Sequence, residues 1–371
     1  MSVDSPCIQV CKLNDTGVCI GCFRTIDEIA AWPGMNDSQK RRVIATLSQR
    51  SQTANVRATD KSMNDLRIIS FLPSATEMAC ALGLAEHLVG ITHECDYPPE
   101  IRTKPAVVRP AIPLEGLSVG EIDAAVSARI RSGESLYQVD EGLLRELAPT
   151  LLLTQNLCQV CAPSGNEVTQ ALKLLQPQPR ILWFTPKSLT GIEENLRELG
   201  RATGREQRAE AVIASGRQRL ERVAALTRRA PARPRVFFME WVDPIYCGGH
   251  WVPEMIELAG GIDALSRKGA DSVRIEWREV TDWAPEVLII SPCGFNLSAA
   301  AEQARQLFQC SGWNELPAVR QNRVYAVDAN SYFARPGPRL IDGVELLATI
   351  IHPGIPELAP QPNAFKHIPV P

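Results

Sequence analysis

The 371-residue sequence predicts an α/β protein with two Rossmann-like lobes joined by a long helix, preceded by a small metal-stabilised four-cysteine helical module. Three observations support this prediction. Short β-rich runs alternate with helical segments in two separate series, which is typical of parallel sheets covered by helices. Between the two series, residues 189–229 contain no proline and carry apolar residues at helical spacing. Four cysteines lie within the first two dozen residues.

The cysteines of the first module follow the spacing C-x3-C-x7-C-x2-C and are Cys7, Cys11, Cys19 and Cys22. Four thiolates at such spacing can hold one zinc ion or an iron–sulfur cluster, and a metal would stabilise so small a core. Free thiols and disulfides are the alternatives. Thr25 and Glu28 predict a capping box at the start of a short helix, which Pro33-Gly34 ends. A second helix is expected over 37–48.

The sequence divides into six expected segments. They are the module (1–50), a polar linker (51–66), the N-terminal lobe (67–187), the connecting helices (188–230), the C-terminal lobe (231–353) and a proline-rich tail (354–371). The β-rich runs predict strands at 67–73, 88–92, 150–154 and 180–185, and then at 235–241, 286–292 and 323–329. Gly200 and Gly204 divide the connecting segment into two helices. Ligands of parallel α/β sheets bind beyond the carboxyl ends of the strands, so a cleft is expected between the lobes.

Composition and charge exclude several classes of protein. The net charge of −3 and pI of about 6.0 do not indicate a nucleic-acid partner. No apolar run is long enough to span a bilayer, so no membrane insertion is expected. The chain opens without a basic and then apolar export signal, and its 11 cysteines suit a reducing compartment. The sequence therefore predicts a cytoplasmic location.

Two resemblances refine these predictions. The segments RIISFLPSATEMACALGL, LVGITHECDYPPE, GHWVPEMIELAGG, VTDWAPEVLIISPCGF and RVYAVDANSYFARPGPRLIDG lie within residues 67–352. That region resembles the helical-backbone class of periplasmic binding proteins, which carry cobalamin or ferric siderophores, and DYPPE resembles the cobalamin binders in particular. Residues 4–50, with SPC, GxCxGCxRT and EIxxW, resemble an uncharacterised bacterial four-cysteine domain (domain of unknown function 1289). The first resemblance implies a corrinoid ligand, and the second implies no activity.

The resemblance places the candidate ligand-binding residues on loops that follow strands of both lobes. They are Pro73, Ser74, Thr76, His93, Glu94, Cys95, Tyr97, Gln155, Cys158, Cys161, Trp183, Glu240, Trp241, His250, Trp251, Cys293 and Tyr332. Aromatic rings suit a large flat macrocycle, and imidazole or thiolate can ligate a metal centre. Packing beneath the lobes is the alternative for Trp183 and Trp241. Glu167 resembles the carboxylate that such proteins present to a permease, with a solvated surface residue as the alternative.

These predictions leave three classes of function open. The first is a cytoplasmic solute-binding-type protein that holds cobalamin or a related corrinoid in the cleft, with no transport role of its own in the periplasm and no catalytic residues. The second is a corrinoid- or thiol-dependent enzyme that uses the cleft cysteines. The third is a metal or iron–sulfur carrier. The sequence contains no catalytic-triad order, P-loop or glycine-rich dinucleotide motif, which disfavours ordinary hydrolases and dehydrogenases.

Overall fold

The structure is a computed structural model of the chain, and it describes residues 3, 5–7, 17–19, 21–58, 65–113, 116–132, 134–155, 175–358 and 363–369. The chain divides into two compact units. One comprises Met1–Asp65 with Ala202–Gly204, and the other comprises Leu66–Arg201 with Arg205–Pro371.

The N-terminal unit contains the two expected helices. α1 (Ile26–Ala31) begins at a capping box in which Thr25 and Glu28 each accept from the other's backbone N–H, at 2.9 and 3.2 Å. A 3-10 turn, η1 (Trp32–Gly34), follows. α2 (Asp37–Ala58) continues well past the predicted end at residue 48, so residues 51–58 of the predicted linker are helical. The reason is local, because residues 37–58 contain no glycine or proline to end the helix.

The first lobe is built on a six-stranded sheet with the order β4-β3-β2-β1-β5-β6. Its strands are β1 (Ile68–Ser70), β2 (Leu88–Thr92), β3 (Ala106–Pro110), β4 (Tyr137–Val139), β5 (Leu151–Thr154) and β6 (Arg180–Trp183). Every pair is parallel except β3 with β4. β1 and β5 are fully buried, as expected for central strands under helices. Strands β3 and β4 form one edge of the sheet and are partly exposed, and neither was predicted from the sequence.

The helices of the first lobe begin at identifiable caps. They are α3 (Pro73–Ala81), η3 (Ala85–His87), η4 (Pro99–Thr103), α4 (Val119–Arg131) and α5 (Glu141–Leu147). Ser118 and Glu121 form a capping box at the start of α4, and Asp140 accepts from Leu143 N (2.9 Å) at the start of α5. α3 begins with Pro73, directly after β1, so its first turn lies at the carboxyl edge of the sheet.

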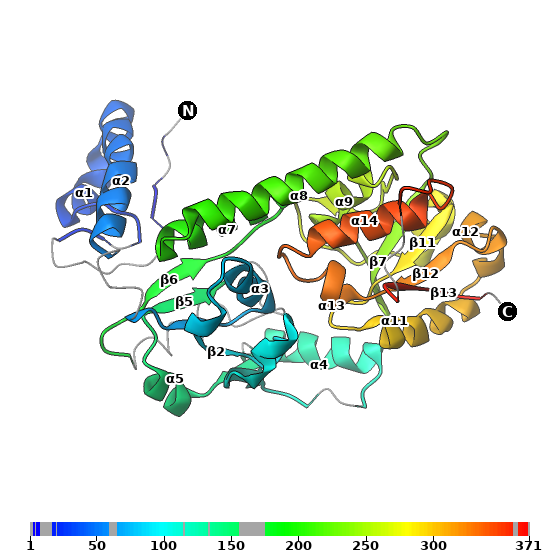
Figure 1. Cartoon of the computed structure of the whole chain (residues 1–371), viewed down its shortest axis with the longest axis horizontal. Helices are drawn as coiled ribbons and strands as arrows, with labels where there is room; N and C mark the ends of the chain where they lie inside the picture. The colour runs from blue at the N-terminus through cyan, green and yellow to red at the C-terminus, as the bar shows by residue number, and fades with distance from the viewer. Residues whose placement is uncertain are drawn as a thin grey trace. The chain divides into compact units, whose positions relative to one another are not determined.

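Two helices connect the lobes, as predicted (Figure 1). α7 (Leu189–Thr203) and α8 (Glu206–Thr227) are separated at Gly204, which has a φ of +65°. Gly200 lies inside α7 and does not break it. A Cβ atom at Gly200 would lie 2.9 Å from the Ala209 side chain, so glycine allows the two helices to approach closely there. The 22 residues of α8 span about 33 Å.

The second lobe contains a five-stranded sheet with the order β13-β12-β11-β7-β8, and a small pair, β10-β9. These strands are β7 (Val236–Val242), β8 (Ile245–Cys247), β9 (Gly249–His250), β10 (Arg267–Lys268), β11 (Val287–Ile290), β12 (Val324–Val327) and β13 (Phe365–His367). β7, β11 and β12 are parallel to one another, whereas β8 and β13 are antiparallel edge strands. β13 comes from the predicted extended tail, because the open edge of β12 offers backbone hydrogen bonds to it.

The helices of the second lobe pack against this sheet and against α8. They are α9 (Val252–Leu258), α10 (Trp277–Trp283), α11 (Leu297–Ala304), η5 (Arg305–Gln309), η6 (Trp313–Glu315), α12 (Pro317–Arg320), α13 (Ala329–Tyr332) and α14 (Leu340–Ile351). α14 lies alongside α8 in Figure 1, and the two helices are in contact. No helix in the described ranges is both long and apolar enough to cross a membrane.

Candidate ligand-binding site

The candidate residues after β1 are buried. Pro73, Ser74 and Thr76 all lie in the first turn of α3, and none of them is exposed. The Thr76 hydroxyl donates to the carbonyl of Leu72 (3.3 Å) and lies 3.1 Å from the Cys95 sulfur. The Thr76 side chain therefore links α3 to the loop after β2.

The loop after β2 combines exposed and buried candidates. His93, Glu94 and Tyr97 are exposed, and Tyr97 retains 45% of its accessible surface. Cys95 is buried, and burial raises the pKa of its thiol to about 12. The thiol is therefore protonated at neutral pH, which removes the thiolate form that ligates soft metals.

The next two strands of the first lobe contribute fewer described candidates. Gln155, after β5, is buried, and Trp183, at the end of β6, is half-buried. Cys158, Cys161 and Glu167 lie outside the described residues, so their predicted roles remain predictions.

In the second lobe, the candidates at the end of β7 are held by local contacts. The Glu240 carboxylate accepts from Gly249 N at 2.9 Å. The indole N–H of Trp241 donates to the Asp243 carbonyl, and its ring meets Phe295 edge-on at 5.6 Å. Trp241 is only half-buried, so part of this ring is accessible.

Two further candidates follow later strands of the second lobe. Cys293 is exposed after β11. Tyr332 is half-buried at the end of α13, and burial raises the pKa of its hydroxyl.

His250 and Trp251 have different environments although they are adjacent. His250 has a left-handed backbone (φ +50°), and its Nε2 lies 2.9 Å from an Asp271 carboxylate oxygen. Burial lowers the pKa of His250, and Asp271 opposes the shift. Trp251 is only 6% exposed, and its indole N–H donates to the Phe333 carbonyl at 2.8 Å. The rings are stacked, but the structure places Trp251 in the core of the lobe.

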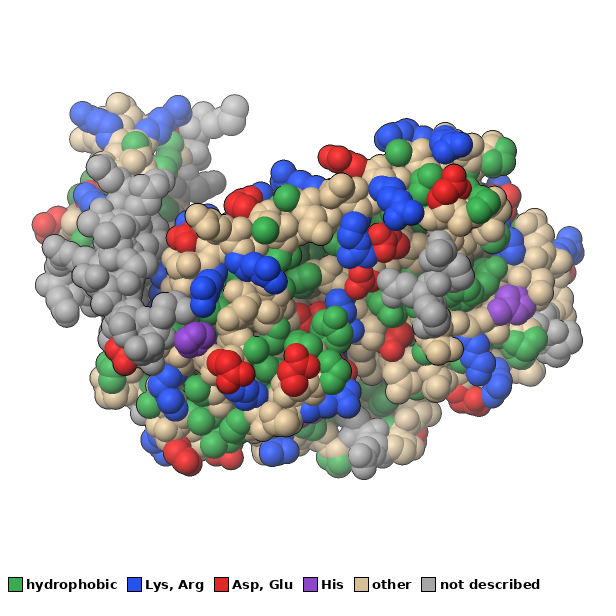
Figure 2. All heavy atoms as spheres, viewed as in Figure 1, with side chains coloured by type: hydrophobic (Ala, Val, Ile, Leu, Met, Phe, Trp, Pro, Cys, Tyr) green, Lys and Arg blue, Asp and Glu red, His purple; other side chains and the backbone are tan. Residues whose placement is uncertain are grey.

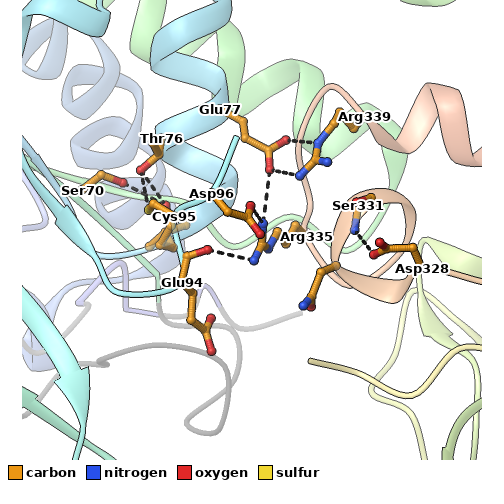
Figure 3. A network of polar contacts seen from close by, with 12 residues as sticks. Ser70, Thr76, Glu77, Glu94, Cys95, Asp96, Asp328, Ser331, Arg335 and Arg339 are labelled. Carbon is orange, nitrogen blue, oxygen red and sulfur yellow. Dashed lines mark hydrogen bonds and ion pairs between the residues drawn. The ribbon is translucent and has the colours of Figure 1, made fainter. Parts of the chain in front are cut away.

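The structure brings together four charged residues that were not among the predicted ligand-binding residues. Glu77 on α3 accepts two hydrogen bonds from Arg339, at 2.6 and 2.9 Å (Figure 3). Arg335 pairs with Asp96 and donates to the Glu94 carbonyl at 2.8 Å. The first-lobe partners lie on α3 and on the loop after β2, whereas both arginines lie between α13 and α14. We refer to Glu77, Asp96, Arg335 and Arg339 as the inter-lobe cluster.

Burial distinguishes three members of the inter-lobe cluster from surface ion pairs, whereas the Asp96 side chain is 39% exposed. The Glu77 side chain is 4% exposed, and those of Arg335 and Arg339 are 10% and 13% exposed. Burial raises the pKa of the Glu77 carboxyl, while the two guanidinium groups act in the opposite direction. A signal for this cluster was present in the sequence, as one acidic residue within the apolar α3 and two arginines four residues apart in RPGPR.

The lobes also meet at a second place, through apolar contact. Val119, at the start of α4, is buried within the core cluster of the second lobe, which includes Phe237 and Leu288. A Cβ atom at Gly120 would lie 3.1 Å from an Asp243 carboxylate oxygen. The two lobes are therefore joined by a polar contact and by an apolar one, besides the connecting helices.

Two cavities in the described residues lie away from the candidate loops. One, of about 350 Å³, is lined mainly by α7, α8 and residues 337–341. The other, of about 690 Å³, is lined by the end of α8, α9 and residues 260–268. Neither is lined by any of the predicted ligand-binding residues.

Two of the predicted metal ligands lie together in the N-terminal unit. Cys19 and Cys22 are both buried, and the Arg24 side chain donates to the Cys22 sulfur at 3.3 Å. Burial alone would raise the pKa of Cys22, but the hydrogen bonds from Arg24 and Cys19 lower it. Cys7 is exposed and Cys11 is outside the described residues. In the described part of the chain, no group of three or more His, Cys, Asp or Glu side chains could hold a metal ion. The structure therefore brings two of the four predicted ligands together but shows no zinc or iron–sulfur site among the described residues.

The surface carries no strong field of one sign on the face drawn in Figure 2, where acidic and basic side chains are interspersed over both lobes. This distribution agrees with the net charge of −3.

Two α/β lobes with parallel sheets, joined by a helical connection, define the chain as a solute-binding protein of the periplasmic type. A family described as "Periplasmic binding protein" matches residues 68–331, which is more than half of the chain, and the chain belongs to this family. Residues 5–51 match a family described as "Protein of unknown function (DUF1289)".

Three similar proteins illustrate the relationship. An uncharacterized ABC transporter substrate-binding lipoprotein, YvrC, of Bacillus subtilis is 27% identical over 82% of this chain and 88% of its own length. A vitamin B12-binding protein of Vibrio cholerae is 27% identical over 77% of this chain and 88% of its own length. The structure of the periplasmic heme-binding protein RhuT from Roseiflexus sp. RS-1 superimposes with a TM-score of 0.59, at 22% identity, over 78% of this chain and 98% of RhuT.

The comparison contradicts the predicted cytoplasmic location. The relatives are described as a substrate-binding lipoprotein of an ABC transporter and as a periplasmic protein. The prediction used the absence of an export signal as its premise, and a missing segment is weaker ground than similarity over most of the chain. The expectation that the protein has no transport role loses its support with it.

Proposed function

We propose that the second unit binds cobalamin or a related corrinoid between the strand ends of its two lobes, as the ligand-binding partner of a membrane transporter. The observation that supports this best is the similarity over most of the chain to a vitamin B12-binding protein. The family membership supports the class of protein, and the ligand is the proposal. Other ligands of the same general shape, such as heme, are the closest competitors, since a relative in fold binds heme.

The accessible candidates at the strand ends suit such a ligand. Tyr97 is exposed, and Trp183 and Trp241 are half-buried. Aromatic faces bury a flat macrocycle at little entropic cost. The His250 imidazole is fixed through Nε2 by Asp271, which leaves Nδ1 as the nitrogen for a ligand metal. We propose these four residues as the contact set and assign no contact to the buried Trp251 and Cys95.

Calorimetric titration tests which ligand the protein binds. Cyanocobalamin, cobinamide and hemin are titrated separately into the full chain, and a corrinoid is expected to bind best. If neither corrinoid binds more tightly than about 100 μM, equivalent to roughly 5–6 kcal/mol, the corrinoid proposal is wrong. Preferential binding of hemin would replace it with a heme-binding function.

A pair of tryptophan variants tests the contact set. Trp183→Ala is expected to weaken cyanocobalamin binding by about 1–3 kcal/mol if the ring packs on the ligand. The control is Trp277→Ala, since Trp277 is also half-buried but lies at the start of α10, with its indole donating to Ser311. Equal effects of the two variants would show that Trp183 acts through stability.

For the N-terminal unit we propose that Cys7, Cys11, Cys19 and Cys22 hold one metal ion or cluster, zinc or iron–sulfur. The supports are their spacing and the contact between Cys19 and Cys22, which a C-x2-C pair of metal ligands requires. Elemental analysis of the full chain is expected to find about one zinc, or iron with sulfide. Cys19→Ser is expected to lose it, while metal-free folded protein would rule the site out.

The remaining alternative, chemistry by cleft cysteines, rests on Cys158 and Cys161. A protein with both residues changed to serine that binds cyanocobalamin as tightly as the parent chain would favour passive binding. If the double serine variant loses cyanocobalamin binding while the parent chain binds, a functional role of the two thiols is favoured.

A further inference from the structure

The inter-lobe cluster joins parts of the chain that the connecting helices alone do not hold together. Glu77 and Arg339 are 262 residues apart in sequence, and Arg335 and Asp96 are 239 apart. Each pair has its acid in the first lobe and its arginine in the second. Any rotation that separates the lobes at this side must break these contacts, since both arginines lie on one short segment between α13 and α14.

The geometry and burial of the Glu77–Arg339 pair make this contact costly to break. Arg339 meets Glu77 through two nearly parallel hydrogen bonds, which is the strongest geometry for this pair of side chains. Removing one partner would leave a charge buried without compensation. An exposed ion pair within one lobe contributes much less to stability. An example is Lys268 with Glu257 in the second lobe, whose side chains are 55% and 51% exposed.

The arginine segment is itself shaped to reach α3. A Cβ atom at Gly337 would lie 3.4 Å from a Glu77 carboxylate oxygen and 3.5 Å from the Ser74 carbonyl, so the backbone here lies directly against α3. Prolines 336 and 338 flank that glycine and restrict its neighbours' dihedrals. The guanidinium of Arg339 also lies over the Tyr97 ring, 4.2 Å from its centroid.

We propose that the Glu77–Arg339 pair is the positioning contact that keeps the two lobes in their binding-competent arrangement before a ligand arrives. Arg335 and Asp96 support it by fixing the loop that carries Tyr97. The apolar contact at Val119 is a separate contact between the lobes, which the removal of this pair leaves in place. Figure 3 shows the two side chains pointing toward each other from α3 and from the start of α14.

The Glu77–Arg339 pair affects ligand binding through the fraction of molecules whose lobes are in the binding-competent arrangement. A ligand that needs both lobes binds with an apparent affinity reduced by the fraction of molecules in the competent arrangement. The pair raises that fraction without touching the ligand, which is preorganisation. This second half of the proposal rests on the proposed function, whereas the arrangement of the ligand-free lobes does not.

A distance measurement between the lobes of the ligand-free protein tests the first half of the proposal, that the Glu77–Arg339 pair positions the lobes. Spin-labelled non-canonical amino acids replace Arg145 and Arg305 in the full chain, because their side chains are 51% and 59% exposed on different lobes. The native cysteines then remain unlabelled. Electron–electron double resonance is expected to give a narrow distance distribution for the parent chain, and a broader and shifted one for Glu77→Gln.

The charge-swapped protein Glu77→Arg/Arg339→Glu is expected to narrow the distribution again, which a loss of folding would not do. Glu257→Gln is the matched control, and it is expected to leave the distribution unchanged. An unchanged distribution in Glu77→Gln would overturn the proposal.

Titration with cyanocobalamin tests the second half on the same proteins. Glu77→Gln is expected to bind about tenfold more weakly, equivalent to 1.4 kcal/mol, while Glu257→Gln binds as the parent does. A broadened distribution with unchanged cyanocobalamin affinity would overturn the link between lobe arrangement and binding. If the parent chain binds no corrinoid, the proposed function fails, and the distance distributions still decide whether the pair positions the lobes.

Discussion

Replacing Trp251 with phenylalanine tests whether this residue belongs to the core of the second lobe. Trp251 is 6% exposed and donates its indole N–H to the carbonyl of Phe333, a residue that is itself 3% exposed. Trp251→Phe keeps an aromatic ring but removes this donor. A buried carbonyl that loses its partner costs about 1–3 kcal/mol, and the space left by the smaller ring adds about 1 kcal/mol.

The expected loss in the free energy of unfolding is therefore about 2–4 kcal/mol. Urea unfolding at equilibrium, followed by circular dichroism, measures it. Trp277→Phe is the control. The indole of the half-buried Trp277 also donates to a backbone carbonyl, that of Ser311, but this hydrogen bond is itself exposed, so water replaces the donor. Its expected cost is below about 1 kcal/mol.

One combination of results would refute the assignment of Trp251 to the core. If Trp251→Phe leaves the free energy of unfolding unchanged but abolishes cyanocobalamin binding, Trp251 stacks on the ligand, as the sequence alone had predicted. The core assignment would then be wrong.

Two further predictions use the titratable side chains. Iodoacetamide at pH 8 is expected to modify the exposed Cys293 of the native protein but not Cys95, whose burial raises its thiol pKa to about 12. Modification of Cys95 before the protein unfolds would contradict this burial. Burial lowers the pKa of His250, so the unfolded chain binds a proton there at a higher pH than the folded chain does. Its contribution to stability is complete above its unfolded pKa of about 6.5 and is lost as the pH falls through and below that value. His250→Gln is expected to flatten this part of the stability profile, measured by urea unfolding from about pH 7.5 to about pH 5; an identical slope in both proteins would show that burial does not shift this histidine.

Several parts of the fold followed directly from local patterns. The capping box at Thr25 and the break at Gly204 both occur where the residues predicted them, because each depends on only a few neighbouring residues. The central strands were also predicted, since a fully buried strand such as β11 is apolar throughout. The two-lobed architecture then follows from the order of strands and helices.

The candidate site was predicted less well, because a strand-end position does not specify exposure. Tyr97 and Trp251 were both chosen as aromatic residues near strand ends, yet one is exposed and the other lies in the core. Which ring faces outward depends on what the rest of the lobe places above it, and for Trp251 that is the segment around Phe333. The edge strands β4 and β13 were missed for a related reason, because they exist only through pairing with a distant neighbour.

The sequence by itself determined the class of this protein, since alternating strands and helices, capping residues and glycine breaks act over a few residues at a time. Tertiary structure alone decided the partners of its buried charges. Glu77 sits in an apolar helix where it has no local partner, and an isolated buried carboxylate is too costly to retain its charge. Folding brings Arg339 to it across 262 residues of chain, because the prolines and the glycine of RPGPR let that segment lie against α3. Burial makes the loss of either partner costly, and burial is a property of the assembled lobes rather than of any segment of the sequence.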